Sequence, residues 1–119
     1  MATPNVLDRL SLLVDPTRNR ILLLLERNEL TVTELCSILQ LPQSTVSRHL
    51  KLLSDDGWLV ARGEGNTRFY KMIGDRLDNA TRDLWAVVRR QFIVTNVASL
   101  VFALRNSGKV LPSSLTARE

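Results

Sequence analysis

The chain has 119 residues, of which 45% are hydrophobic and only 5% aromatic, so we expect one domain with an aliphatic core rather than a disordered chain. Its net charge of +4 suits a polyanionic partner such as nucleic acid, although many proteins without such a partner share this charge. The single cysteine excludes an internal disulfide and favours a cytoplasmic location, and we expect neither a signal peptide nor a membrane span.

Two helices are predicted at the start of the chain from apolar residues at helical spacing. The first is expected over residues 5–14 and the second over residues 16–27. Asp15 and Pro16 mark the boundary, because Asp is a good helix N-cap and Pro suits the first helical position. One apolar face is expected on the second helix: Ile21, Leu22, Leu24, Leu25.

A pair of short helices joined by a tight turn is predicted next. Thr31 and Glu34 have the spacing of a capping box, and a third helix is expected over residues 32–39. Pro42 stops that helix, and a fourth is expected over residues 44–53. The side chains of the fourth helix that should face the core recur at i, i+4 and i+7: Val46, Leu50, Leu53.

The period of the apolar residues then shortens from that of a helix to about two, which is typical of β-strands. Strand-like segments at residues 58–62 and 67–72 flank Gly63-Glu64-Gly65-Asn66, whose composition is typical of a turn. The helical pattern returns over residues 75–105, and residues 109–119 are expected to form a flexible tail. The expected fold class is therefore mainly α-helical with a small β-hairpin, in one domain over residues 1–108.

This order of elements favours DNA binding. A tight turn between two helices lets the second project from the surface, and a helix has the width of the DNA major groove. The fourth helix carries hydrogen-bonding side chains suited to bases and phosphates: Gln43, Ser44, Thr45, Ser47, Arg48, Lys51. The hairpin adds Arg62 and Arg68 on either side of its turn. No phosphate-binding loop or pair of catalytic carboxylates indicates an enzyme.

The segment TVTELCSILQLPQSTVSRHLKLLSDDGWLVARGEGNTRFYKM, preceded by Asp15-Pro16-Thr17-Arg18, resembles the ArsR/SmtB family of winged-helix repressors over roughly residues 6–73. The resemblance implies a winged helix-turn-helix homodimer that binds the two halves of an inverted-repeat operator in double-stranded DNA. Many members release DNA when an inducer binds. The resemblance adds His49 to the DNA-facing residues of the recognition helix and Asn66 to those of the wing.

The chain departs from the metal sites of that family. A thiol-based site uses ELCVCDL, whereas this chain has ELCSIL at residues 34–39, with Cys36 at the first cysteine position and Ile38 at the second. The other common site needs paired Asp and His residues, and the single histidine here is His49. We therefore expect no metal and no cofactor. Cys36 is open to three interpretations: a core thiol, a redox sensor or a metal ligand.

The first and last helices are expected to form the dimer interface, as the resemblance implies. A domain this small cannot bury the apolar faces of both helices within one subunit. The expected interface residues are Leu7, Leu10, Leu84, Trp85, Val88 and Phe92. Two alternatives stay open: a DNA-binding module of a larger protein, such as a methyltransferase fusion, and a dimeric interaction module without DNA binding. The inducer is unknown.

Overall fold

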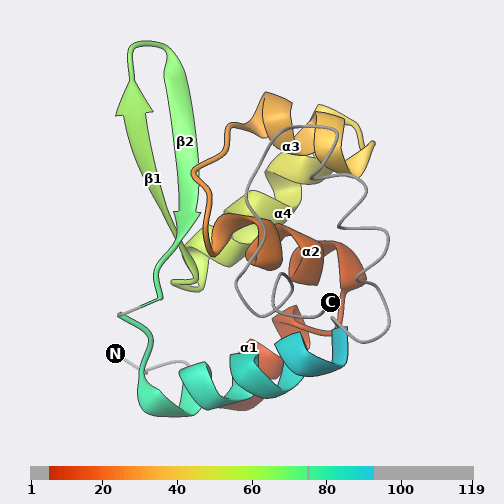
Figure 1. The fold of residues 1–119 in the computed structure, drawn as a ribbon, viewed down its shortest axis with the longest axis vertical. Helices are drawn as coiled ribbons and strands as arrows, with labels where there is room; N and C mark the ends of the chain where they lie inside the picture. The colour runs from red at the N-terminus through yellow and green to blue at the C-terminus, as the bar shows by residue number, and fades with distance from the viewer. Residues whose placement is uncertain (1–5, 75, 93–119) are drawn as a thin grey trace, which may run out of the picture.

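The computed structural model describes residues 6–74 and 76–92 (Figure 1). Four helices precede an antiparallel hairpin, and a fifth helix follows it. The bounds are α1 (Val6–Leu12), α2 (Pro16–Leu25), α3 (Val32–Leu39), α4 (Gln43–Asp55), β1 (Leu59–Glu64), β2 (Thr67–Met72) and a final helix whose described part spans residues 79–92. The predicted fold class, a winged helix-turn-helix, is confirmed.

Helix α2 lies at the centre of the subunit. Asp15 caps it as predicted, since its Oδ1 accepts hydrogen bonds from the backbone N–H groups of Thr17 at 2.7 Å and Arg18 at 3.3 Å. The helix contacts both α4 and β2. Because it is enclosed, it buries Leu23 as well as the four apolar residues of the predicted face, each to 1% exposure or less. The predicted apolar face is therefore confirmed, and the buried surface of α2 extends beyond it to Leu23.

The helix-turn-helix is set by local signals that the sequence contains. At the start of α3, Thr31 Oγ1 accepts from Glu34 N–H at 3.1 Å, and Thr31 N–H donates to Glu34 Oε1 at 3.0 Å. The predicted capping box is therefore confirmed. At its end, Gln40 adopts a left-handed conformation with φ of 57°. This residue turns the chain toward Pro42, after which α4 begins.

The wing is a hairpin with a tighter turn than predicted. Residues pair from Leu59↔Met72 to Glu64↔Thr67, so Gly63 and Glu64 belong to β1. Only Gly65 and Asn66 form the turn, and Gly65 has a φ of 63°, which glycine adopts without strain. The expected four-residue turn was wrong because the cross-strand pairing continues through Glu64.

The loop between α2 and α3 extends the wing's sheet by one bridge. Leu30 N–H donates to Tyr70 C=O at 3.0 Å, and Tyr70 N–H donates to Leu30 C=O at 2.8 Å. The bridge is antiparallel and lies on the edge of β2 that faces away from β1. The base of the wing is thereby hydrogen-bonded to the helical body.

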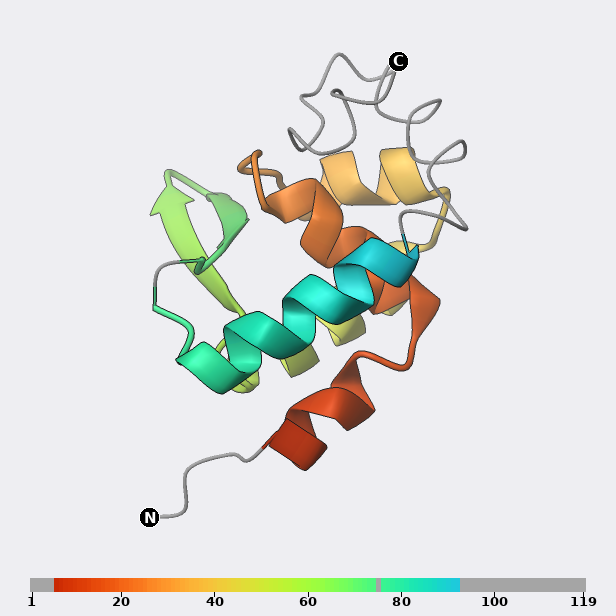
Figure 2. The same cartoon turned by 60° about the horizontal axis from the view of Figure 1, so that its bottom comes forward.

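The final helix begins at residue 79, four residues later than predicted. Asp78 Oδ1 accepts from Thr81 N–H at 2.8 Å, so the Asp78 side chain caps the start of this helix. Figure 2 shows this helix lying across the subunit beside α1. Residues 93–105 of the predicted helix and the expected tail lie outside the described residues. In the part of the chain that is described, no helix is long and apolar enough to span a bilayer.

Candidate nucleic-acid interface

Helix α4 has two distinct sides. The predicted core residues Val46, Leu50 and Leu53 are buried, each to 1% exposure or less. The other side carries the predicted polar residues, which are exposed except for the half-buried Thr45: Gln43, Ser44, Ser47, Arg48, Lys51. The hydrophobic contacts of α4 therefore fix its orientation, and its polar side faces outward.

The polar side chains begin in the first turn of α4. Pro42 precedes the helix and provides no side-chain cap, and the N–H groups of Thr45 and Val46 donate to its carbonyl at 3.1 Å. The N-terminal end of a helix carries partial positive charge, which favours an anion such as phosphate. Gln43 and Ser44 stand at this end and are exposed.

Lys51 forms an ion pair within α4. Its Nζ lies 3.1 Å from Asp55 Oδ2, with 77% and 65% of the two side chains exposed. An exposed pair of this kind contributes about 0.2–1 kcal/mol, so a phosphate can displace the carboxylate at little cost. The pair holds Lys51 on the outer side of the helix.

His49 lies inside the subunit, unlike the other predicted residues of α4. It is only 6% exposed, and its Nδ1 lies 3.3 Å from Nη1 of Arg18 on α2. Burial lowers the pKa of His49; Arg18 and Arg48 act in the same direction, and Asp15 opposes them. Because a guanidinium only donates, Nδ1 is the acceptor in this contact, which requires a neutral ring. The expectation that His49 faces DNA is corrected, because its side chain packs toward α2.

Arg18 extends the same connection to the end of α1. Its Nε donates to the carbonyl of Leu12 at 2.6 Å, and its Nη1 lies 3.9 Å from Asp15 Oδ2. One guanidinium thus joins α1, the cap of α2 and the recognition helix. No local sequence signal indicates this role of Arg18, because Arg18 and His49 are 31 positions apart in the chain.

The two arginines of the wing lie on opposite faces of the hairpin. In the register, Arg62 pairs with Phe69 and Gly63 pairs with Arg68, and side chains of successive residues alternate between the faces. Arg68 and Asn66 are both exposed. The two arginines therefore cannot make the same contact with a partner.

Arg62 is held by two carboxylates. Its Nη2 donates to Glu29 Oε1 at 2.9 Å, and its Nη1 donates to Glu64 Oε2 at 2.8 Å. The guanidinium also stands 4.8 Å from the centroid of the Phe69 ring. The hydrogen bond from Arg62 lowers the pKa of Glu29, and the two glutamates raise the pKa of Arg62. In this structure Arg62 joins the wing to the α2–α3 loop.

Lys71 is a further basic residue of the wing that was not predicted as a site residue. It is exposed on β2 and pairs with Val60, on the same face of the hairpin as Arg62 and Phe69. Its charge helps to lower the pKa of Glu29. The alternation of side chains along the predicted strand 67–72 could have placed it on this face.

The residues expected at the dimer interface fall into two groups. Leu7 and Leu10 on α1 are exposed, Leu7 to 73%. Trp85 and Phe92 are buried within the described subunit, whereas Leu84 and Val88 are half-buried and pack against the core. The exposed apolar residues around α1 and the final helix form what we call the apolar stripe: Val6, Leu7, Leu10, Val14, Val87.

Trp85 packs in the core instead of anchoring an interface, which corrects the expectation. Its ring meets that of Trp58 edge-on, with centroids 6.2 Å apart and planes at 70°. Its Nε1 donates to Glu26 at 3.3 Å, and Glu26 is also paired with Arg89 at 2.8 Å. Trp85 therefore joins the final helix to the junction between α4 and the wing.

Cys36 is half-buried on α3 and packs against the hydrophobic core. Within residues 6–74 and 76–92, no three side chains of His, Cys, Asp or Glu come together in a way that would hold a metal ion.

The two-sided helix α4, the tight turn before it and the hairpin after it define a winged helix-turn-helix DNA-binding protein. Similarity to known proteins identifies the family within this class. The sequence model described as bacterial regulatory protein, arsR family, matches residues 15–59. The chain belongs to this family of transcriptional regulators.

Two curated relatives illustrate the match. An uncharacterised helix-turn-helix transcriptional regulator from Methanocaldococcus jannaschii is 42% identical over 64 residues, which cover 53% of this chain and 72% of the relative. The arsenical resistance operon repressor of Staphylococcus xylosus is 36% identical over 75 residues, which cover 63% of this chain and 72% of the relative.

Solved structures share the fold. Reduced HlyU from Vibrio cholerae is 34% identical with a TM-score of 0.57, over 70% of this chain and 83% of that one. A homodimeric winged helix-turn-helix DNA-binding domain from Mycobacterium bovis is 25% identical with a TM-score of 0.56, over 81% of this chain and 92% of that one.

Proposed function

We propose that this protein is a homodimeric transcriptional repressor that binds an inverted-repeat operator in double-stranded DNA. The observation that carries the proposal is the two-sidedness of α4. Its inner side is buried against the core, and its outer side presents a row of exposed hydrogen-bonding side chains beside a projecting wing. A surface of this kind fits a regular polyanion whose base edges differ in their donors and acceptors.

In the proposed complex α4 lies in the major groove. Arg48 can pair with guanine and Gln43 with adenine at their base edges, and Lys51 and Ser44 reach phosphates. Asn66 and Arg68 contact the flanking backbone or minor groove. Arg62 and His49 take no part in direct contact and instead hold the wing and α4 in place.

The apolar stripe supports a dimer. Val6, Leu7 and Leu10 on α1 and Val87 on the final helix are exposed, and a two-fold axis through the stripe would cover all of them in both subunits. Two recognition helices related in this way reach half-sites about one helical turn, roughly 34 Å, apart. The homodimeric domain from M. bovis supports the assembly, and the S. xylosus repressor supports repression. Action on DNA in the cytoplasm is part of the same proposal.

The test of DNA recognition is binding to a promoter fragment from the protein's own gene neighbourhood, against a scrambled fragment, across a salt series. We expect Arg48→Ala to weaken specific binding by about 10–100-fold, the range for a side chain that reads one base pair. Lys51→Ala should weaken both fragments alike and reduce the salt dependence. Arg90→Ala is the matched control, because Arg90 is an exposed arginine on the final helix and belongs to neither α4 nor the wing. Unchanged affinity in the Arg48→Ala, Lys51→Ala double variant would refute the recognition helix.

The test of the dimer is sedimentation of Leu7→Asp. Leu7 is exposed within the subunit, so the charge should leave the subunit folded and prevent the apolar stripe from being covered. We expect a monomer at concentrations where the unchanged protein is a dimer. Val60→Asp, which adds the same charge to an exposed apolar position on the wing, should leave the dimer intact. A dimeric Leu7→Asp protein would place the interface elsewhere.

A further inference from the structure

A polar contact joins the central helix α2 to the helix proposed to bind DNA, α4. Nη1 of Arg18 lies 3.3 Å from Nδ1 of His49, whose side chain is buried. The guanidinium is held in place on its other side, because its Nε donates to the carbonyl of Leu12 at the end of α1 at 2.6 Å. A guanidinium has donors only, so His49 must supply the acceptor. The contact therefore requires a neutral imidazole.

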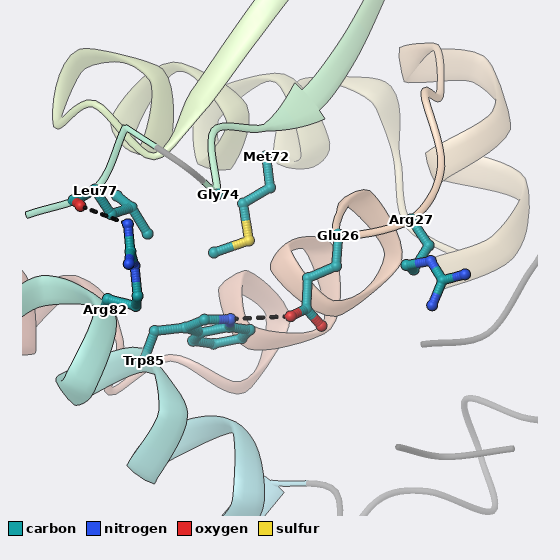
Figure 3. A pocket seen from close by; sticks show the side chains of 7 residues that line it. All are labelled: Glu26, Arg27, Met72, Gly74, Leu77, Arg82 and Trp85. Carbon is teal, nitrogen blue, oxygen red and sulfur yellow. Dashed lines mark hydrogen bonds between the residues drawn. The ribbon is translucent and has the colours of Figure 1, made fainter. Parts of the chain in front are cut away.

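Helix α2 is held at both ends by contacts that do not involve α4. Near its start, Asn19 Nδ2 donates to the carbonyl of Leu13 at 2.9 Å. At its end, Figure 3 shows the indole N–H of Trp85 directed at Glu26, and it donates to Oε2 of that residue at 3.3 Å. A change at the contact with His49 should therefore move α4 rather than α2.

Three charged groups of the described fold act on the His49 ring. Burial lowers the pKa of His49; Asp15, the cap of α2, raises it, and the charges of Arg18 and Arg48 lower it. Burial raises the pKa of Asp15, but hydrogen bonds from the backbone N–H groups of Thr17 and Arg18 outweigh burial and lower it, so Asp15 stays ionised in mildly acidic solution. The chain has a single histidine, so His49 is the side chain expected to change charge between about pH 7.5 and pH 5.5.

We propose that Arg18 is a positioning residue for α4 and that a proton on His49 releases this hold, so that sequence-specific DNA binding weakens in mildly acidic solution. The proton places a donor and a positive charge against the guanidinium, and the two side chains separate. Arg48, which is proposed to read a base, directly precedes His49 in α4, so a displacement of His49 also displaces Arg48. The effect on DNA rests on the proposed function, whereas the Arg18–His49 contact does not.

The expected direction is opposite to that of simple charge attraction. A proton on His49 adds a positive charge, which by itself would strengthen binding to DNA of any sequence. Loss of the contact with Arg18 instead weakens binding to the operator, while binding to scrambled DNA, which depends on phosphate contacts, changes little. A comparison of the two kinds of DNA across pH therefore separates positioning from charge.

The size of the effect is limited by the uptake of one proton. The pKa of His49 in the fold lies below its ordinary value of 6.5, so operator affinity should be constant above that pH and fall below it. One proton changes an equilibrium by at most about tenfold per pH unit. We expect operator affinity to fall by about twofold to tenfold between about pH 7.5 and pH 5.5.

The first experiment measures binding of the full chain to the promoter fragment and to the scrambled fragment over this pH range at constant salt, with tryptophan fluorescence to confirm the fold at each pH. His49→Gln keeps an acceptor oxygen and does not titrate, so its operator affinity should not depend on pH. Arg18→Gln should lose the pH dependence as well. Arg90→Gln is its matched control, because it also removes one positive charge but lies on the final helix, and it should keep the pH dependence.

The second experiment needs no DNA. Because His49 is the single histidine, one imidazole signal in the NMR spectrum of the untagged chain reports its pKa. We expect that pKa to lie below 6.5 and to rise in Arg18→Gln, which removes a positive charge beside the ring. The pKa in Arg90→Gln should equal that of the unchanged protein.

Operator affinity that stays constant or rises on acidification, or that falls equally in His49→Gln, would overturn the proposal. So would an equal pKa of His49 in Arg18→Gln and Arg90→Gln. If Arg18→Gln does not fold, the comparison of His49→Gln with the unchanged protein still decides the effect on DNA. A chain that shows no preference for the promoter fragment at about pH 7.5 would contradict the proposed function, and the NMR titration would then decide separately whether Arg18 controls the proton on His49.

Discussion

Nη1 of Arg18 on α2 lies 3.3 Å from Nδ1 of His49 on the recognition helix. This contact can form only while the imidazole is neutral, because a protonated ring has a donor at both nitrogens. This contact between α2 and the helix proposed to bind DNA thus depends on the protonation state of a buried histidine.

The stability of the protein should therefore fall in mildly acidic solution. The pKa of His49 is lowered in the folded state, so the unfolded chain binds a proton more readily. The stabilising effect is complete above the unfolded pKa of about 6.5 and is lost as the pH falls below it toward the folded pKa. Urea unfolding between about pH 7.5 and pH 5.5 should show a falling midpoint. His49→Gln keeps an acceptor without titrating, and its midpoint should change less; an equal change would exclude His49 as the cause.

The two wing arginines should behave differently in DNA binding. Arg68→Ala should reduce the salt dependence of binding by about one unit of slope, as expected when one phosphate contact is lost. Arg62→Ala should change that slope less, because Arg62 is engaged by Glu29 and Glu64. Equal slopes for the two variants would mean that Arg62 leaves its glutamates when DNA binds.

Replacing Gln40 by glycine should stabilise the protein. A side chain in the left-handed region costs about 1 kcal/mol, which glycine avoids, so we expect a gain of up to about 1 kcal/mol in the free energy of unfolding. The variant loses an exposed hydrogen bond from Gln40 Nε2 to the Ser37 carbonyl. Ser37→Gly, at an exposed position inside α3, should instead destabilise by roughly 0.5–1 kcal/mol. A destabilised Gln40→Gly protein would show that this side chain is needed at the turn.

Trp85 should contribute to the stability of the subunit more than to dimer formation. Trp85→Phe keeps an aromatic ring but leaves Glu26 without one donor, and we expect a loss of about 1–3 kcal/mol in unfolding free energy. The dissociation constant of the dimer, measured by sedimentation, should change by no more than a few-fold. A weakened dimer with unchanged subunit stability would restore Trp85 to the interface.

The elements of this fold were predictable because their signals are local. Asp15 and Thr31 cap their helices through residues two or three positions away, and Pro42 and Gly65 determine the turns beside them. The predicted end of β1 was less accurate, because it depends on hydrogen-bonded pairing between the strands. β1 continues through Glu64 because Thr67 of β2 lies opposite it.

The roles of individual site residues were harder to predict, since they depend on contacts between distant segments. His49 does have a sequence signal for burial, because it lies three residues after Val46 and four before Leu53. The resemblance to a recognition helix led instead to the prediction that His49 faces DNA. Nothing near Arg62 or Trp85 in the sequence indicates that Glu29 or Glu26 is the partner, which only the folded chain brings into contact.

The bridge between Leu30 and Tyr70 has a mechanical consequence. It clamps the wing at its root, while Gly65 and Asn66 at the tip are joined to nothing but their own strands in the described fold. A force on the tip should therefore bend the outer part of the hairpin more than its base, which is hydrogen-bonded to Leu30. In the proposed DNA complex, this bending would let the wing fit flanking grooves of different width while α4 keeps its position on the bases.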